Sequence, residues 1–220
     1  MPPKLLVFDC DGVLVDSEAL VVEVEAELLT AAGFAITAEE ITERFVGLSY
    51  GSMMAALGAE HGRPVPDELS RRVQQAALDE FPSRLRPVPG IGDLLAALDG
   101  DRCVASSSDL DRIQLSLTVT GLDDHFEPDH IFSAQMVARG KPAPDLFELA
   151  ADRLEAAPAS CLVIEDSPAG VSAARAAGMA VVGLLAGGHA RPGLGERLVA
   201  AGAKLTFDTV AELGDHLASL

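Results

Sequence analysis

The chain has 220 residues, 49% hydrophobic and 23% charged, a composition typical of a folded globular protein with a substantial core. Sixteen basic against 34 acidic residues give a formal net charge of -18, which argues against binding nucleic acid or an anionic membrane through the general surface. The apolar run near the N-terminus is too short for a signal peptide or a membrane span, and we expect a cytoplasmic protein.

Short apolar runs bounded by turn residues predict buried strands. The runs cover residues 4–8, 102–106, 130–133, 161–165, 180–185 and 204–207. Continuous hydrophobicity is typical of strands buried on both faces, and helical patterns such as residues 145–157 and 168–179 lie between most of them. This alternation predicts an α/β fold, a parallel sheet with helices on both faces.

One segment interrupts the alternation. Residues 17–81 contain only helical patterns, one of them opened by a capping box from Thr37 to Glu40. The proline-rich residues 81–90 look like a linker back to the sheet. We therefore expect a helical insertion at residues 16–84 and a core domain made of residues 1–15 and 85–220.

The three cysteines, Cys10, Cys103 and Cys161, lack a CxxC spacing and lie in or beside predicted strands. We expect them to be buried structural thiols.

Acidic pairs follow two predicted strands. Asp9 and Asp11 alternate after the first strand, so both should project beyond its carboxyl end, and Gly12 permits a tight turn. Glu165 and Asp166 follow a later strand. Ligands bind at this edge of an open α/β sheet, and a hard cation between the pairs would relieve their repulsion. We expect Mg²⁺, although an isolated DxD can also be a turn or a helix cap.

Groups of opposite polarity follow other strands. Ser106, Ser107 and Ser108 stand where a strand gives way to a helix, so hydroxyls and helix amides can face an anion. Ser108 with Asp111 also fits a capping box. Lys141, one of only three lysines, lies in a loop restrained by prolines, where a surface position is the alternative.

Four motifs in order, "DCDGVLVDSE", "VASSS", "GKPAPDLF" and "VIEDSPAGVSAARAAG", span nearly the whole chain. Together they resemble the haloacid dehalogenase superfamily, specifically its beta-phosphoglucomutase-like phosphatase branch with a helical cap. The resemblance implies a Rossmann-like, doubly wound core.

The resemblance also implies roles for the residues of these motifs. It makes Asp9 the nucleophile and Asp11 the general acid/base. The implied phosphate contacts are Ser106, Ser107 and Lys141. The implied Mg²⁺ ligands are Asp9, Asp166 and the Asp11 backbone carbonyl, with Glu165 assisting.

The sequence differs from the motifs of related branches of the superfamily, and these differences narrow the choice of reaction. The second aspartate, Asp11, is typical of phosphoryl transfer and not of dehalogenation, and the insertion contains no lysine for Schiff-base chemistry. Val21 and Tyr50 stand where the resembling sugar phosphomutases carry a histidine and an arginine, which favours simple hydrolysis.

We predict a Mg²⁺-dependent phosphatase that hydrolyses a small phosphomonoester, a sugar or sugar-acid phosphate, through an aspartyl phosphate. The alternatives are a sugar phosphomutase and, in another class, a phospho-accepting receiver domain. We expect a small phosphorylated metabolite as partner, no nucleic acid, no membrane, and a monomer or homodimer.

Residues outside the motifs carry weaker predictions. In the insertion, Glu18, Ser49 and Tyr50 are possible substrate contacts, although Glu18 also suits a helix N-terminus. We expect Asp16 to mark a hinge and helix cap. Residues 186–193, "AGGHARPG", are expected to form a plain connector, and all five histidines are expected at surface or loop positions.

Overall fold

The computed structural model describes residues 2–45 and 50–220. The chain divides into two compact units. The core unit comprises Met1–Asp16 and Arg86–Leu220, and the helical unit comprises Ser17–Leu85. Among the described residues, no helix is both long enough and apolar enough to span a membrane.

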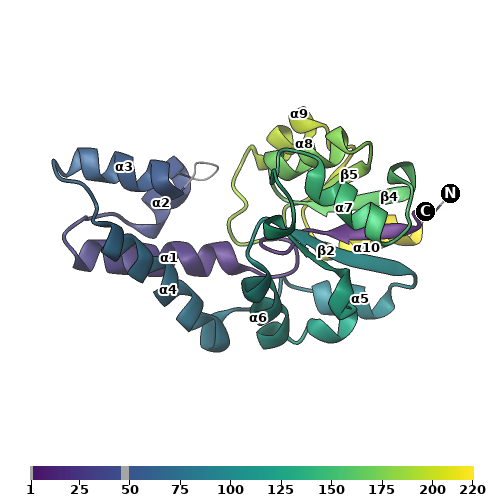
Figure 1. Cartoon of the computed structure of the whole chain (residues 1–220), viewed down its shortest axis with the longest axis horizontal. Coiled ribbons are helices and arrows are strands. Elements are labelled where there is room, and N and C mark those ends of the chain that lie inside the picture. The colour runs from purple at the N-terminus through teal and green to yellow at the C-terminus, as the bar shows by residue number, and fades with distance from the viewer. Residues whose placement is uncertain (1, 46–49) are drawn as a thin grey trace. The chain divides into compact units, whose positions relative to one another are not determined.

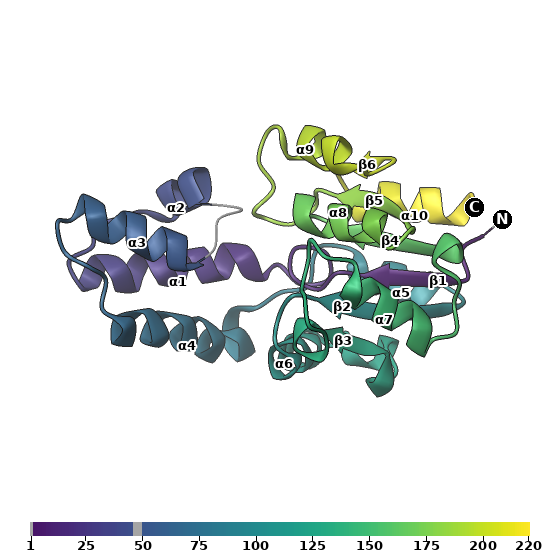
Figure 2. The same ribbon diagram turned by 45° about the horizontal axis from the view of Figure 1, so that its top comes forward.

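The core unit is built on a parallel sheet of six strands within the described residues, in the order β3-β2-β1-β4-β5-β6 (Figures 1 and 2). The strands are β1 (Leu5–Phe8), β2 (Asp101–Ser106), β3 (Ile131–Ser133), β4 (Cys161–Glu165), β5 (Ala180–Leu184) and β6 (Thr206–Phe207). The predicted α/β fold with a doubly wound parallel sheet is confirmed.

Helices follow the strands in alternation. They are α5 (Ile91–Ala97), α6 (Leu110–Thr120), α7 (Asp145–Arg153), α8 (Pro168–Ala176), α9 (Leu194–Ala201) and α10 (Val210–Ala218). Short 3-10 turns add η1 (Asp123–His125), η2 (Pro128–His130), η3 (Ala134–Met136) and η4 (Pro158–Ser160). A crossover helix between parallel strands is the expected connection, because parallel strands cannot be joined by a tight hairpin.

The sheet is buried on both faces. Leu5 and Val7 of β1 pack with α7, α8 and α9 in one apolar cluster. Leu6 and Phe8 alternate with them and point to the other face, where α5 and α10 contact each other (Figure 2). Burial on both faces explains why β1 is uninterruptedly apolar.

The helical unit contains α1 (Ser17–Ala31), α2 (Ala38–Phe45), α3 (Tyr50–Glu60) and α4 (Asp67–Arg84). Its own apolar core includes Leu29, Phe34 and Leu57, each at most 1% exposed. The capping box that opens α2 is confirmed, because the Thr37 N–H donates to Glu40 Oε2 at 2.8 Å and the Glu40 N–H donates to Thr37 Oγ1 at 3.1 Å.

Several predicted boundaries were wrong. Helix α4 continues through Pro82 to Arg84, so the first part of the predicted linker is helical. Phe81 is fully buried and its carbonyl accepts the Leu85 N–H at 3.0 Å, which holds the last turn in place. The last strand is also shorter than predicted and begins at Thr206.

Candidate active site

The register of β1 and β4 sets the first acids side by side. Phe8 aligns with Ile164, and the Asp9 N–H donates to the Ile164 carbonyl at 3.0 Å. Asp9 and Glu165 therefore stand at the same level of the sheet. The chain leaves β1 toward β2 on one side and returns to β4 on the other, so this is the switch point where α/β folds bind ligands.

The turn after β1 requires glycine. Gly12 has φ of 80°, in the left-handed region, and its N–H donates to the Val15 carbonyl at 2.8 Å. A Cβ at this position would lie 1.8 Å from Asp166 Oδ2. The absent side chain lets the Asp9–Asp11 loop approach the acids that follow β4.

Lys141 connects the two acid-bearing strands. Its Nζ donates to Asp9 Oδ1 at 2.6 Å, to Glu165 Oε1 at 2.7 Å and to the Ala105 carbonyl at 2.9 Å. Burial by itself lowers the pKa of Lys141, but the Asp9 and Glu165 carboxylates outweigh it, so the pKa lies above its ordinary value. The side chain is 4% exposed, so the alternative of a solvated surface lysine is wrong.

Glu165 organises the loop after β4. Its Oε2 accepts from the Asp166 N–H at 2.9 Å, the Ser167 N–H at 2.8 Å and the Ser167 hydroxyl at 2.9 Å. Gly170, in the first turn of α8, makes room for it, because a Cβ there would lie 1.6 Å from Glu165 Oε1. Glu165 thus holds both Lys141 and the start of α8.

Three buried carboxylates form a possible cation site. Within the described residues, Asp9, Glu165 and Asp166 each offer one oxygen, and these atoms lie within 4.8 Å of one another. Burial raises the pKa of Asp9 well above its usual range; Lys141 opposes this, while Glu165 and Asp166 add to it. Three carboxylates face one ammonium, so a divalent cation would balance the excess negative charge. An all-oxygen donor set fits Mg²⁺.

Asp11 is held apart from this cluster. Ser108 Oγ donates to its Oδ2 at 2.6 Å, and the Arg112 guanidinium donates to its Oδ1 at 2.9 Å. The predicted capping role of Ser108 was wrong, because the N-cap of α6 is Asp109 and the Ser108 hydroxyl is directed to Asp11. Arg112, four residues further along, was missed by the sequence analysis.

The other two serines occupy different environments. Ser106 is 1% exposed and its Oγ accepts the Ser108 N–H at 3.1 Å, whereas Ser107 is exposed. Ser106 ends β2 and Ser107 begins the loop to α6, and their contact with a phosphoryl group stays a prediction.

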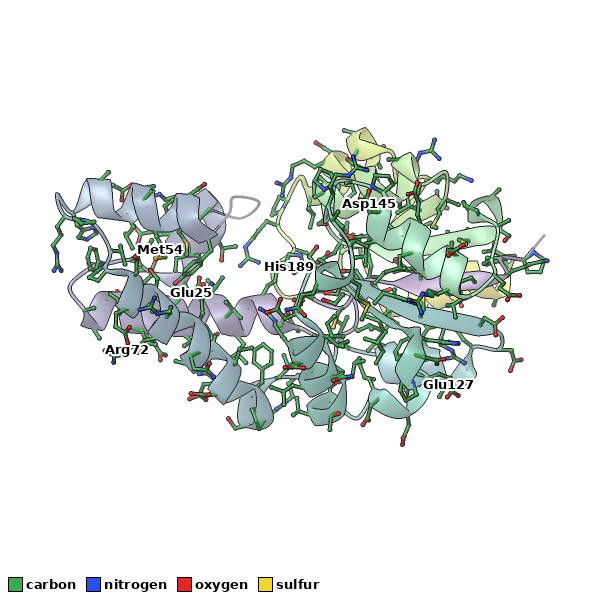
Figure 3. The ribbon with its side chains drawn as sticks, in the orientation of Figure 1. Glu25, Met54, Arg72, Glu127, Asp145 and His189 are labelled. Atoms are coloured by element: carbon green, nitrogen blue, oxygen red, sulfur yellow. The ribbon has the colours of Figure 1, made fainter. Side chains whose placement is uncertain are left out.

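The loop between β5 and α9 reaches the same site, so its interpretation as a plain connector was wrong. His189 Nε2 lies 3.0 Å from Asp166 Oδ2, and His189 is 8% exposed (labelled in Figure 3). The Gly188 N–H donates to Asp16 Oδ1 at 2.9 Å, so Asp16 holds this loop in addition to standing at the boundary of the units. The only sequence signal was a histidine that follows two glycines.

The predicted substrate contacts of the insertion belong to the helical unit. Glu18 lies in the first turn of α1. The Tyr50 hydroxyl donates to the Ser70 carbonyl at 3.2 Å, and burial, with a further contribution from Glu25, raises the pKa of Tyr50 to about 12. Ser49 lies outside the described residues. Their role as substrate contacts stays a prediction.

Comparison with known proteins identifies the class to which this fold and site belong. The family model of haloacid dehalogenase-like hydrolases matches residues 3–178. The chain therefore belongs to the haloacid dehalogenase-like hydrolase family and is a hydrolytic enzyme. The predicted family is confirmed, and the receiver-domain alternative is excluded.

Individual relatives extend over most of the chain. The 6-phosphogluconate phosphatase of Escherichia coli (strain K12) is 31% identical over 84% of this chain and 84% of its own length. The beta-phosphoglucomutase of Bacillus subtilis (strain 168) is 32% identical over 96% of this chain and 93% of its own. A hydrolase of the same family from Deinococcus radiodurans R1, solved with bound phosphate and sodium, has a TM-score of 0.86 and 34% identity, covering 99% of this chain and 96% of that one.

Proposed function

We propose that this protein is a Mg²⁺-dependent phosphatase that hydrolyses a sugar or sugar-acid phosphate through an aspartyl phosphate on Asp9. The main support is the buried ammonium of Lys141, which lies 2.6 Å from Asp9 at the switch point of the sheet. An anionic substrate could approach an anionic nucleophile only where positive charge is concentrated, and Lys141 supplies it.

In the first step, an Asp9 oxygen attacks phosphorus and the bond from phosphorus to the ester oxygen breaks. Lys141, already bonded to Asp9, orients the nucleophile and stabilises the charge on the phosphoryl oxygens. Asp11 gives its proton to the departing alkoxide. This assistance is worth about 10²- to 10⁴-fold in rate.

In the second step, Asp11 takes a proton from water, and the water oxygen attacks phosphorus. The bond from phosphorus to Asp9 breaks, which releases inorganic phosphate and restores the carboxylate. Covalent catalysis of this kind divides one difficult displacement into two easier ones. Asp11 lies on the same loop as the nucleophile Asp9. Its hydrogen bonds with Ser108 and Arg112 hold its carboxylate outside the acid cluster.

Mg²⁺ would be held by Asp9, Asp166 and the Asp11 carbonyl, with Glu165 assisting. When bound, it supplies positive charge that reduces repulsion between the nucleophile and the phosphoryl group. Ser106 and Ser107, before α6, are the proposed phosphate contacts together with Lys141.

The substrate class rests on the relatives. One is named for 6-phosphogluconate, a sugar-acid phosphate, and another for a phosphoglucomutase reaction. We assign residues 16–84 as a cap, in which Glu18, Ser49 and Tyr50 contact the part of the substrate beyond the phosphate.

The Bacillus subtilis relative supports a second candidate function, sugar phosphomutase. We prefer hydrolysis, because Val21 and Tyr50 replace the histidine and arginine of the mutase motif. Rapid interconversion of glucose 1-phosphate and glucose 6-phosphate would establish the mutase in its place.

The test is phosphate release from a panel of sugar and sugar-acid phosphates with Mg²⁺. We expect turnover with at least one of them, loss of turnover with EDTA, and loss in Asp9→Asn. Asp99→Asn is a matched control, because Asp99 is exposed and precedes β2 at the opposite edge of the sheet. Undiminished turnover in Asp9→Asn would refute the proposed nucleophile.

A further inference from the structure

We propose that His189 is a positioning residue: it orients Asp166 as a ligand of the cation site. This inference rests on the proposed metal-dependent function. His189 Nε2 and Asp166 Oδ2 are 3.0 Å apart, and the two side chains are 8% and 5% exposed. Asp166 belongs to the group of three carboxylates that could hold a cation.

The 3.0 Å separation is within hydrogen-bonding distance. An ionised carboxylate oxygen can only accept, so we infer that Nε2 carries a proton and faces Asp166 as the donor. This bond restricts rotation of the carboxylate about its last torsion. Because less freedom is lost when a cation binds, a preoriented ligand binds it more tightly.

The backbone on both sides of the imidazole is shaped to admit it. A Cβ on Gly187 would lie 2.8 Å from His189 Nδ1, and a Cβ on Gly12 would lie 2.7 Å from His189 Cε1. Two glycines from distant parts of the sequence therefore flank the ring. One of them belongs to the turn that also carries Asp9 and Asp11.

The main chain of the loop is hydrogen-bonded on both sides of His189. The Gly188 N–H donates to Asp16 Oδ1 at 2.9 Å, and the Ala190 N–H donates to the Gly187 carbonyl at 2.9 Å. The residues before and after His189 are thus hydrogen-bonded. Because the ring is held in a fixed position, its contact with Asp166 fixes the orientation of the Asp166 carboxylate.

The test measures binding of Mn²⁺ alone by electron paramagnetic resonance, without substrate. We expect His189→Leu to weaken Mn²⁺ binding by about tenfold or more, as is typical when the partner of a metal ligand is removed. His189→Gln keeps an N–H donor, so its affinity for Mn²⁺ should lie between those of the wild type and His189→Leu. His125→Leu is the matched control, because η1 follows α6 at the opposite edge of the sheet.

A folded His189→Leu protein that binds Mn²⁺ as tightly as the wild type would overturn the proposal. Equal losses in the Leu and Gln variants would overturn the assignment to the N–H donor. If His189→Leu does not fold, His189→Ala takes its place and should also weaken binding; unchanged binding there would count against the proposal. Because no turnover is measured, failure of the proposed phosphatase reaction leaves this result interpretable.

Discussion

Both units contain ion pairs, and one group of charges from each unit shows two opposite environments. In the helical unit Arg84 donates to Glu23 at 2.6 Å, with side chains that are 37% and 56% exposed. In the core unit Lys141 donates to Asp9 and Glu165, and the three side chains are 4%, 10% and 0% exposed.

The exposed pair and the buried cluster differ in what they can contribute to stability and to catalysis. An exposed pair contributes about 0–1 kcal/mol, because water screens it and ordering two long side chains costs entropy. Buried charges cost several kcal/mol to desolvate and are a poor way to gain stability. The core cluster is therefore best explained by what it does with a substrate and a cation.

The largest effect is expected when the buried pairing is broken. Lys141→Met leaves Asp9 and Glu165 buried without their ammonium, and we expect the free energy of unfolding to fall by about 3–5 kcal/mol. Urea titration in EDTA measures this, with exposed Lys4→Met as control. A fall in the free energy of unfolding of less than about 1 kcal/mol would mean that the Lys141 pairing contributes no more than an exposed ion pair.

The loss should also depend on pH. Burial already raises the pKa of Asp9 in the folded protein, and removing Lys141 removes the charge that opposes this shift. The folded variant then keeps a proton on Asp9 to higher pH than the unfolded chain does. Its stability should fall as the pH rises from the unfolded to the folded pKa of Asp9.

A smaller effect is expected from the half-buried pair of Arg112 and Asp11, whose side chains are 30% and 18% exposed. Arg112→Met should reduce kcat for a sugar phosphate by about tenfold or more, a part of the full acid/base contribution. The second step, in which Asp11 acts as base, is common to all substrates, so the two substrates are compared by the pre-steady-state rate of leaving-group release. The loss in that rate should be smaller with p-nitrophenyl phosphate, whose leaving group does not need a proton. Arg153→Met, on the exposed side of α7, is the control. Equal losses in this first-step rate on both substrates would show that Arg112 does not support Asp11 as the acid.

Thiol reactivity reports how readily the core unit opens. All three cysteines belong to the core unit and are at most 2% exposed, as the sequence predicted. Burial raises the pKa of Cys10 and of Cys103, so little thiolate is present at pH 8. We expect slow labelling by a thiol reagent in the native state and complete labelling in urea. Labelling of any one cysteine within seconds would show that the core opens readily.

The smallest effect is expected at the surface of the helical unit. Glu23→Gln removes the partner of Arg84, and we expect the free energy of unfolding to change by less than about 1 kcal/mol. Thermal or urea unfolding provides the measurement. A loss of about 2 kcal/mol or more would mean that this exposed pair resembles the buried one.

The sequence predicted those parts of the site that follow directly from strands. Buried parallel strands are recognisable as apolar runs, and the residues after them necessarily meet at one sheet edge, so Asp9, Asp11, Glu165 and Asp166 could be placed in advance. The position of Lys141 was also indicated, because lysines are rare in this chain.

The remaining contacts depend on tertiary packing, which local patterns do not report. Ser108 satisfied a capping pattern, yet its hydroxyl donates to Asp11 across 97 positions of the chain. His189 contacts Asp166 because Gly12 and Gly187 leave room for the ring. Helix α4 passes the proline that predicted its end, because the buried Phe81 anchors its last turn.

The central claim is that Asp9 carries the phosphoryl group, and trapping that group on Asp9 tests it most directly. Asp11→Asn removes the base for the second step, while p-nitrophenyl phosphate needs no acid in the first. With Mg²⁺, we expect a burst of one nitrophenolate per enzyme and a phosphorylated peptide containing Asp9 by mass spectrometry. Turnover without a burst, with phosphate on no residue and with activity retained in Asp9→Asn, would contradict the account.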